Sequence, residues 1–412
     1  MRHKKLLFIL KRISAKKIVA IVFLATLLVI AAFMTPSTLM SISTIINSED
    51  KDFSTSINEI NALYRYMLEF KGSFPTDKGA YINLNGFMAR VIGQRYVNDR
   101  VKLYNGHLTN INVARNPVNA GIQMTKLNDH QVEKGKYFLF VITPSQLPKY
   151  ENIMPAGYTD YSHANADNLL EILKNNNVPF LDLREELDKD GISYSDAFYV
   201  TDHHWKPEIG FWAYTKIVDF LVDNKMMGQI DPMYTDFNKY NIELYKDFFL
   251  GSSGKRTGSY YAGVDDFGIV VPKDDNWGKD VVLEIPSIGV LVKESFKDVI
   301  FDHRDFEDSP DYFIANPYGR YGYGDKDHKN YFNAASPLDQ RILAIGDSYS
   351  ISTFSYLSLV ANRLDCLDMR YFKYNFAEYY YDYDPDIIIV LVNGGSGTVS
   401  ENTTYDFFGD MG

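Results

Sequence analysis

The sequence has very little cysteine and little histidine. A single cysteine, Cys366, occurs in 412 residues. One thiol makes neither an intrachain disulfide nor a multi-thiolate metal site. This usage fits an intracellular protein, or an extracytoplasmic one from a cell that makes little use of disulfides. Only 8 residues are histidine, so two adjacent histidines at 203–204 call for an explanation.

Basic residues are also outnumbered. The chain has 42 Lys and Arg against 53 Asp and Glu, a net charge of −11. A nucleic-acid groove needs clustered Lys and Arg, and the one basic cluster lies at the extreme N-terminus. We therefore expect no nucleic-acid partner. The hydrophobic share of 46% is enough for a sizeable core. The 31 tyrosines suit either packing in a Tyr-rich core and rim or stacking on sugar rings, and packing is the simpler interpretation.

The N-terminal sequence predicts the cellular location of the protein. Residues 1–17 are strongly basic, and residues 18–34 form an uncharged apolar run that is about long enough to cross a bilayer as a helix. By the positive-inside rule, residues 1–17 form a cytoplasmic tail, 18–35 a transmembrane helix, and the rest lies outside. The alternative is a signal peptide cleaved near Ala31-Ala32. We favour a single-pass anchor in the cell membrane, because the run is long for a signal peptide and no clean A-x-A site follows it.

After this segment, residues 36–78 are polar and read as a stalk with an amphipathic helix at 56–70. We predict a catalytic domain at 79–412, in which residues 226–310 break the pattern as a partly antiparallel insertion.

Apolar runs almost free of polar residues indicate strands covered on both faces. The fold class is therefore α/β, a three-layer arrangement of a mostly parallel sheet flanked by helices. The expected strands are 136–143, 178–183, 311–316, 341–347, 368–372 and 385–393, and the expected helices are 167–177, 209–224 and 354–364.

The run RILAIGDSYSIS (341–352) is a hydrophobic strand followed by Gly346-Asp347-Ser348 and a helical stretch. A serine on a sharp strand-to-helix turn exposes its hydroxyl, and backbone N–H groups there can face a developing oxyanion. Gly346 permits close backbone approach. The same pattern also fits a simple helix cap by Asp347 or Ser348, so the triplet alone does not decide between these roles.

The segment TDHHWKPE (201–208) supplies the partners that a nucleophilic serine needs. Asp202 and His204 can meet around a tight turn, which leaves the second ring nitrogen free to face Ser348. Pro207 and Glu208 look like the opening of a helix. A metal site of Asp202, His203 and His204 and a purely structural cluster are the alternatives. We prefer the triad and expect no metal, because adjacent loop histidines rarely converge on one ion.

These two motifs together resemble the DHHW-motif branch of the SGNH (GDSL-like) hydrolase superfamily and are similar to the catalytic domain of alginate O-acetyltransferase-like proteins. The block at 81–108 and PDIIIVLVN (385–393) extend the resemblance over about residues 79–396. It implies an SGNH-like fold with permuted motif order, in which the acid–base pair precedes the serine. By position, Asp202 orients, His204 is the base and Ser348 is the nucleophile. His203 falls on the variable position, with a pocket-lining role, and Trp205 packs behind the loop.

The resemblance implies a membrane-anchored, extracytoplasmic serine O-acyltransferase that O-acetylates a cell-surface or exported polysaccharide without a cofactor. A multi-span membrane acyltransferase is then the expected acyl donor. An esterase with the same triad and a non-catalytic glycan-binding protein of an export complex are the alternatives. Asn393 is either a second oxyanion donor beside Gly346 and Ser348 or part of a strand-end turn. Arg256 either holds an anionic sugar or phosphate or lies in a solvated Gly-rich loop. Relatives that act on alginate carry a C-terminal carbohydrate-binding module, and we expect none here.

Overall fold

A computed structural model describes residues 78–304, 306, 311–394 and 406–408. The chain divides into two units, Met1–Ala80 and Tyr81–Gly412, and almost all of the first lies outside the described residues. The predicted cytoplasmic tail (1–17), transmembrane helix (18–35) and most of the stalk (36–78) therefore lie outside them too. No helix in the described part of the chain is both long and apolar enough to span a bilayer.

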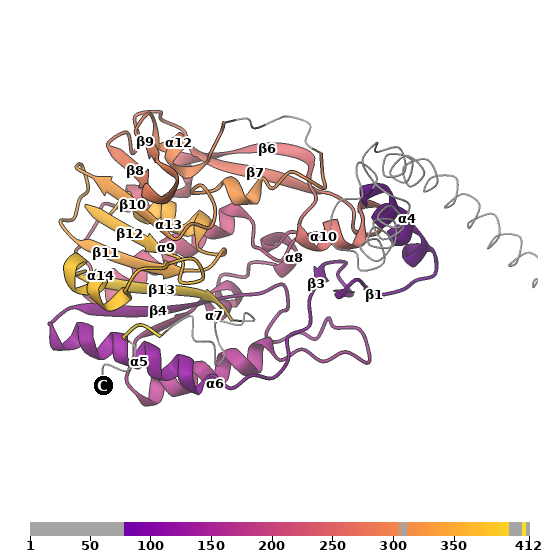
Figure 1. Cartoon of the computed structure of the whole chain (residues 1–412), viewed down its shortest axis with the longest axis horizontal. Coiled ribbons are helices and arrows are strands. Elements are labelled where there is room, and N and C mark those ends of the chain that lie inside the picture. The colour runs from indigo at the N-terminus through magenta and orange to yellow at the C-terminus, as the bar shows by residue number, and fades with distance from the viewer. Residues whose placement is uncertain (1–77, 305, 307–310, 395–405, 409–412) are drawn as a thin grey trace, which may run out of the picture. The chain divides into compact units, whose positions relative to one another are not determined.

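The second unit is built on an eight-stranded sheet with the strand order β5-β4-β13-β11-β12-β10-β8-β9. The first five strands are mutually parallel. They come from hydrophobic runs that the sequence places correctly in most cases, and their carboxyl ends share one edge of the sheet (Figure 1). Their bounds are β5 (Phe180–Asp182), β4 (Tyr137–Thr143), β13 (Ile387–Asn393), β11 (Arg341–Gly346) and β12 (Arg363–Leu367).

The other three strands are antiparallel to their neighbours, so the sheet is mixed and the prediction of a mostly parallel sheet is corrected. These strands are β10 (His328–Asn333), β8 (Val281–Ile285) and β9 (Val290–Val292). The sequence gives little signal for β10, because HKNYFN is mostly polar and Tyr331 and Phe332 alone do not make an apolar run. Strands β8 and β9 fall within 226–310, so part of that range completes the main sheet.

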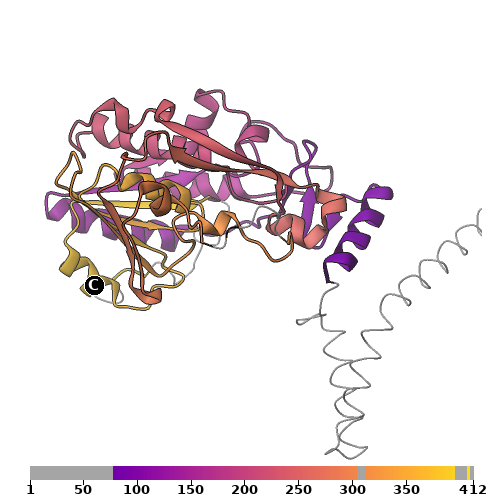
Figure 2. The ribbon, with the colours of Figure 1, turned by 90° about the horizontal axis from the view of Figure 1, so that it is seen from above.

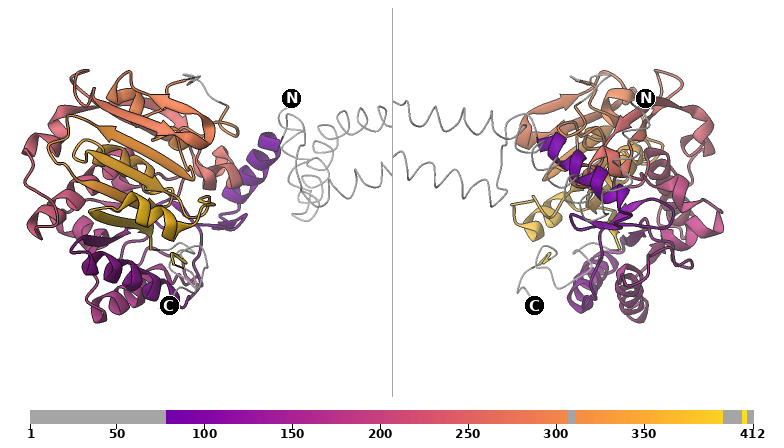
Figure 3. Two further views of the ribbon diagram at one scale, coloured as in Figure 1. Left: turned by 60° about the vertical axis from the view of Figure 1, so that its left-hand side comes forward. Right: turned by 90° about the vertical axis from the view of Figure 1, so that its right-hand side faces the viewer.

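Helices cover both faces of the sheet, which makes three layers (Figures 1 and 3). Along β11 successive side chains alternate: Ile342 and Ala344 pack in one apolar cluster, and Leu343 and Ile345 pack in the other. This period of two, apolar on both faces, is the reason the strand is buried on both sides. The first cluster includes α7 (Leu183–Lys189), α9 (Pro207–Asp223) and α13 (Ile351–Leu357), and the second α5 (Val118–Glu133), α6 (Ser162–Asn175) and α14 (Phe376–Tyr383).

Smaller elements gather at one end of the unit, on the side toward which β13 points (Figures 1 and 2). A three-stranded sheet, a long antiparallel pair and several short helices lie there or next to it. They are α4 (Lys78–Val91), β1 (Tyr96–Val97), β2 (Arg100–Lys102), β3 (Leu108–Thr109), α8 (Tyr194–Ala197), β6 (Tyr240–Phe249), α10 (Ser252–Thr257), α11 (Ser259–Ala262) and β7 (Asp265–Pro272). Helix α12 (Phe296–Ile300) lies apart from them, against β7, β8 and α13.

Three predicted elements are wrong in place or kind. Residues 311–316 form turns, and the Asp311 side chain accepts the Phe313 N–H there. No strand forms at 368–372, and the strand lies just before that range, as β12. Asp365 interrupts the apolar pattern of β12, although its side chain is fully buried. The helix expected at 354–364 is α13, which begins earlier and ends at Leu357. A buried carboxylate held by Tyr379 is a tertiary interaction, which periodicity does not detect.

Candidate active site

The TDHHW segment lies in a loop between α8 and α9. An isolated bridge between Phe198 and Trp205 closes the loop, and the Lys206 N–H donates to the Ala197 carbonyl. Helix α9 begins with Pro207 at its first position, where a missing N–H costs nothing. The predicted helix opening is therefore confirmed, and the loop is held at both ends.

Ser348 lies on the turn between β11 and α13, as the sequence predicts. Asp347 shapes this turn: its two carboxylate oxygens accept the Tyr349 and Asn393 N–H groups at 3.0 and 2.9 Å. Helix α13 starts only at Ile351, and the Ser350 side chain does not cap it. Asp347 thus ties the turn to the end of β13 instead of capping the helix, and Ser348 makes no capping bond.

The structure brings the three predicted side chains together. The Nε2 atom of His204 lies 2.8 Å from the Ser348 hydroxyl, and Nδ1 lies 2.5 Å from Asp202 Oδ1. His204 and Asp202 are buried, and Ser348 is half-buried. An ionised carboxylate only accepts hydrogen bonds, so Nδ1 carries the proton and Nε2 is free to accept the serine proton. This is the geometry of a nucleophile, a general base and an orienting acid.

Asp202 is held from several sides. Its Oδ2 accepts the Ser252 N–H at 2.6 Å, and its Oδ1 also accepts the His204 N–H at 3.0 Å. Burial alone raises the pKa of a carboxyl, but the two histidines and these hydrogen bonds outweigh it and hold the pKa of Asp202 well below its usual range. A methyl group on Gly251 would collide with Asp202, so only glycine permits this approach of α10 to the loop.

A second buried acid, Asp265 at the start of β7, fixes the residues just before the dyad. Its carboxylate accepts the Val200 N–H, the Thr201 N–H and the Thr201 hydroxyl, all within 2.9 Å. Thr201 in turn accepts the Gly251 N–H through its hydroxyl and the Gly254 N–H through its carbonyl. The loop and α10 therefore form one hydrogen-bonded assembly around Asp202.

His203, on the variable position of the motif, lies beside the dyad. Its ring centroid is 3.8 Å from that of His204, and its Nδ1 lies 3.0 Å from the Ser252 hydroxyl. Burial and the neighbouring His204 lower the pKa of His203 to about 4. The ring is therefore neutral at pH 7 and adds no positive charge beside His204.

Three aromatic side chains hold the loop and the serine turn together. Trp205 is fully buried and donates from Nε1 to the Tyr349 carbonyl, which agrees with its predicted packing role. The Tyr349 hydroxyl donates to the His203 carbonyl. Tyr318 stacks on the His204 ring and donates to the Ser348 carbonyl at 3.2 Å. Sequence reasoning missed Tyr318 because NPYGRYGYG (316–324) carries no spacing that marks one tyrosine among three.

The metal alternative competes with these hydrogen bonds. Donor atoms of Asp202, His203 and His204 lie within 4.8 Å of one another. However, the two nitrogens of His204 face Asp202 and Ser348. An ion on this trio would have to displace one of these contacts, so the metal site and the catalytic arrangement exclude each other.

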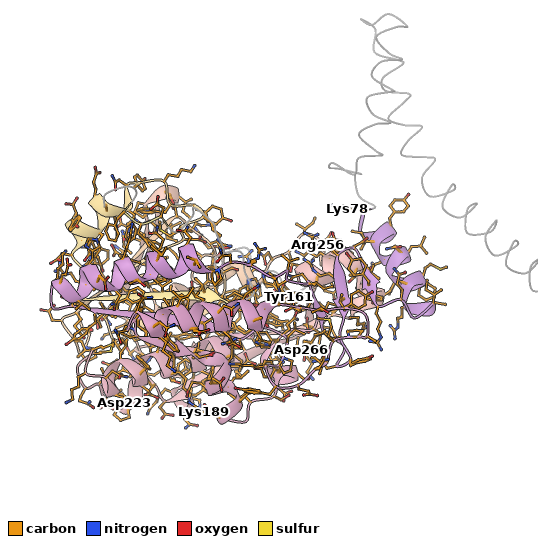
Figure 4. All side chains as sticks on the ribbon, turned by 90° about the horizontal axis from the view of Figure 1, so that it is seen from below. Lys78, Tyr161, Lys189, Asp223, Arg256 and Asp266 are labelled. Atoms are coloured by element: carbon orange, nitrogen blue, oxygen red, sulfur yellow. The ribbon has the colours of Figure 1, made fainter. Side chains whose placement is uncertain are left out.

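The remaining predicted residues fall at different places. Gly346 ends β11, and a Cβ there would collide with the Ser350 side chain. Asn393 ends β13, is buried, and hydrogen-bonds the Tyr349 side chain, one residue from Ser348. Arg256 is exposed on α10, and no ion pair or hydrogen bond of its guanidinium occurs within the described residues (Figure 4).

Comparison with known proteins supports the fold. Residues 104–245, which include Asp202 and His204 but not Ser348, match the family model of an SGNH hydrolase-like domain of the acetyltransferase AlgX. The resemblance inferred from the motifs is therefore confirmed. No curated protein matches the chain significantly in sequence.

Two solved structures are similar over most of their length. PatB1 of Bacillus cereus, solved with a sulfonyl adduct, is 17% identical over 73% of this chain and 96% of its own, with a TM-score of 0.60. A DHHW family protein from Eubacterium siraeum is 15% identical over 75% of this chain and 95% of its own, with a TM-score of 0.55. At these identities the likeness shows a shared α/β fold.

Proposed function

We propose that this chain is a serine O-acyltransferase that transfers an acetyl group to a hydroxyl of a cell-surface or exported glycan. In this proposal residues 18–35 anchor it in the cell membrane, the catalytic unit faces outward, and a multi-span membrane acyltransferase supplies the acyl group. The observation that carries the proposal is the hydrogen-bonded chain from Ser348 through His204 to Asp202.

The reaction follows from that geometry. The Ser348 oxygen attacks the acyl carbonyl while His204 Nε2 takes its proton, and Asp202 stabilises the resulting imidazolium. His204 then gives the proton to the leaving group, which departs and leaves an acyl-serine. A glycan hydroxyl attacks this ester, its proton passes to Nε2, and Ser348 leaves as the hydroxyl. In this scheme the Ser348 N–H and Asn393 stabilise the developing oxyanion.

The similar proteins support a transfer reaction over other uses of the triad. The matching family model is named for an acetyltransferase. Hydrolysis by the same triad, with water as the acceptor, is the nearest alternative, and a non-catalytic glycan-binding role in an export complex is the second.

A fluorophosphonate probe tests the nucleophile. We expect covalent labelling of the full chain, its loss in Ser348→Ala, and unchanged labelling in Ser287→Ala, where an exposed serine outside the site is removed. Labelling that persists in Ser348→Ala contradicts the nucleophile. Absence of labelling in the unmodified chain favours the non-catalytic alternative.

Product analysis separates transfer from hydrolysis. With 4-nitrophenyl acetate as donor and a glycan as acceptor, we expect the O-acetylated glycan in the mass spectrum, in a Ser348-dependent amount. Release of acetate alone, or removal of acetyl groups from an acetylated glycan, identifies an esterase. The topology is tested by fusing a reporter that works only in the cytosol to the C-terminus, and activity of that reporter overturns the proposed orientation.

A further inference from the structure

The unit carries a group of positive charges without carboxylate partners. Several cations elsewhere in the unit pair with acids, as Arg184 does with Asp167 and Asp182, and Arg370 with Asp368. Six cations near α4, β2 and α10 make no ion pair within the described part of the chain. This basic surface consists of Arg90, Arg95, Arg100, Lys102, Lys255 and Arg256. In a chain of net charge −11, such a cluster needs an explanation.

Neutral groups hold several of these side chains in place. Arg90, Lys102 and Lys255 donate to the carbonyls of three residues on α11 or in the loop after residue 311, at 2.6 to 3.2 Å. Arg95 lies over the Tyr104 ring, 4.8 Å from its centroid. Carbonyls and rings orient a cation without forming an ion pair with it, so the surface is arranged to attract an anion.

The positive charges are close enough to act on one another. Burial and the charges of Arg90 and Arg95 lower the pKa of Lys102. Burial and the charge of Arg256 lower the pKa of Arg100, and the nearby carboxylates of Asp99 and Asp202 act in the opposite direction. Like charges held together are unfavourable unless a counter-charge binds between them. Figures 1 and 2 show α4, β1 and α10 grouped at the same end of the unit.

Two adjacent serines join this surface to the triad. Arg100 Nε donates to the Ser253 hydroxyl at 2.9 Å. Ser252 lies 3.0 Å from His203 through its hydroxyl and donates its N–H to Asp202. The basic surface therefore begins next to the catalytic dyad and extends away from it toward α4.

Exposed tyrosines border the same surface. Tyr96 is 40% exposed, and Tyr104 and Tyr260 are each 60% exposed. Such rings combine an apolar face with a polar hydroxyl, which suits the faces and hydroxyl edges of sugar rings. Exposed apolar side chains also occur on and just after α4, at Phe87, Met88, Val91 and Ile92. Around β2 and α10, next to the dyad, the exposed side chains beside the cations are tyrosines, which favours a charged carbohydrate there over a lipid surface.

We propose that the basic surface binds an acidic glycan through its carboxylate or phosphate groups and leads it to Ser348. The identity of the glycan as acyl acceptor rests on the proposed function, but binding itself does not. Carboxylate and phosphate share the bidentate geometry that arginine recognises. The class of acceptor is thus a polyanionic polysaccharide.

Binding of matched oligosaccharides to the full chain in detergent tests this. We expect an oligogalacturonide to bind at least about tenfold more tightly than its carboxyl-reduced form at low salt, with an advantage that shrinks at high ionic strength. We expect Arg256→Gln to weaken this binding about threefold, as removal of one exposed ion pair does. The double variant Arg100→Gln with Arg256→Gln should weaken it about tenfold. Lys189→Gln, which removes one exposed charge far from Arg256 in Figure 4, leaves it unchanged.

Arg256 is exposed and its side chain makes no hydrogen bond in the described residues, so its variant keeps the test valid if Arg100→Gln does not fold. A glycerol-phosphate oligomer forms a second arm: tighter binding than the oligogalacturonide identifies phosphate as the anion recognised. Equal affinity for charged and reduced oligosaccharide overturns the proposal. The proposal is also overturned if the arginine variants lose more binding to phosphatidylglycerol vesicles than to either oligomer. Binding needs no turnover, so a failure of the proposed acyl transfer is seen separately.

Discussion

Tyr318 stacks on His204, with ring centroids 4.0 Å apart and planes inclined by 17°, while its hydroxyl donates to the Ser348 carbonyl. One side chain therefore touches both the His204 ring and the Ser348 backbone, although it comes from a separate segment of the chain. We assign Tyr318 a positioning role: it fixes the plane of the imidazole relative to the serine hydroxyl.

Tyr318→Phe tests this role while keeping the stack. Losing one hydrogen bond to a backbone carbonyl costs about 1 kcal/mol, so we expect kcat to fall about fivefold with little change in KM. Tyr318→Leu removes the stack as well and lowers kcat further. A role limited to folding predicts lower Tm with unchanged kcat in the folded fraction, and that result contradicts the assignment.

Asp202→Asn tests the orienting acid. The amide can donate where the carboxylate only accepts, so it favours the wrong tautomer of His204. We expect kcat to fall by about 10³ to 10⁴ with the fold retained, by analogy with triads in which the acid is amidated. Steady-state kinetics with 4-nitrophenyl acetate, together with circular dichroism to verify folding, measures this. A loss of less than tenfold argues that another group orients His204.

Trp205→Phe tests the packing behind the loop. The change leaves the buried Tyr349 carbonyl without its donor and opens a small cavity, which costs about 2 to 4 kcal/mol of unfolding free energy. Trp212→Phe is the matched control, because Trp212 is only partly buried and donates to an exposed partner on the surface. We expect the control to lose less than about 1 kcal/mol in urea unfolding. Equal losses contradict the role of Trp205.

His203 predicts a pH dependence of stability. Its pKa is about 4 in the folded protein, against about 6.5 in an unfolded chain. The unfolded state therefore binds the proton first on acidification, and stability falls as the pH drops from about 6.5 to about 4. We expect His203→Gln to make this slope shallower, while His107, His163 and His303, whose pKa values burial also lowers, keep part of it. Urea midpoints at pH 7 and pH 4.5 measure it, and a wild-type slope equal to that of the variant contradicts the shift.

Asp202 makes stability depend on pH at lower pH values than His203 does. Its folded pKa lies below its unfolded value of about 3.9, so its stabilising contribution is full above that pH and is lost as the pH falls toward the folded pKa. The stability difference between wild type and Asp202→Asn should therefore shrink steadily as the pH falls below about 3.9. A stability difference that grows on acidification is the opposite sign and rejects this account.

The parallel half of the fold could be predicted from the sequence. FLFVI, ILAI and DIIIVLV are apolar on both faces, and only strands buried on both sides need that pattern. The serine turn and the histidine loop were also predictable, because short motifs with fixed spacing mark them. The antiparallel half was not: β10 is held by pairing with β12 and β8, and its own residues are mostly polar, without a clear apolar run.

The sequence by itself thus determined which residues have the chemistry for a triad and which strands are buried, since both depend on residue type and local spacing. Only the tertiary structure decided what surrounds them. Tyr318, Ser252 and Asp265 reach the site from three separate segments, and the basic surface gathers cations from α4, β2 and α10. Such contacts arise from how distant segments pack, and no local periodicity records that.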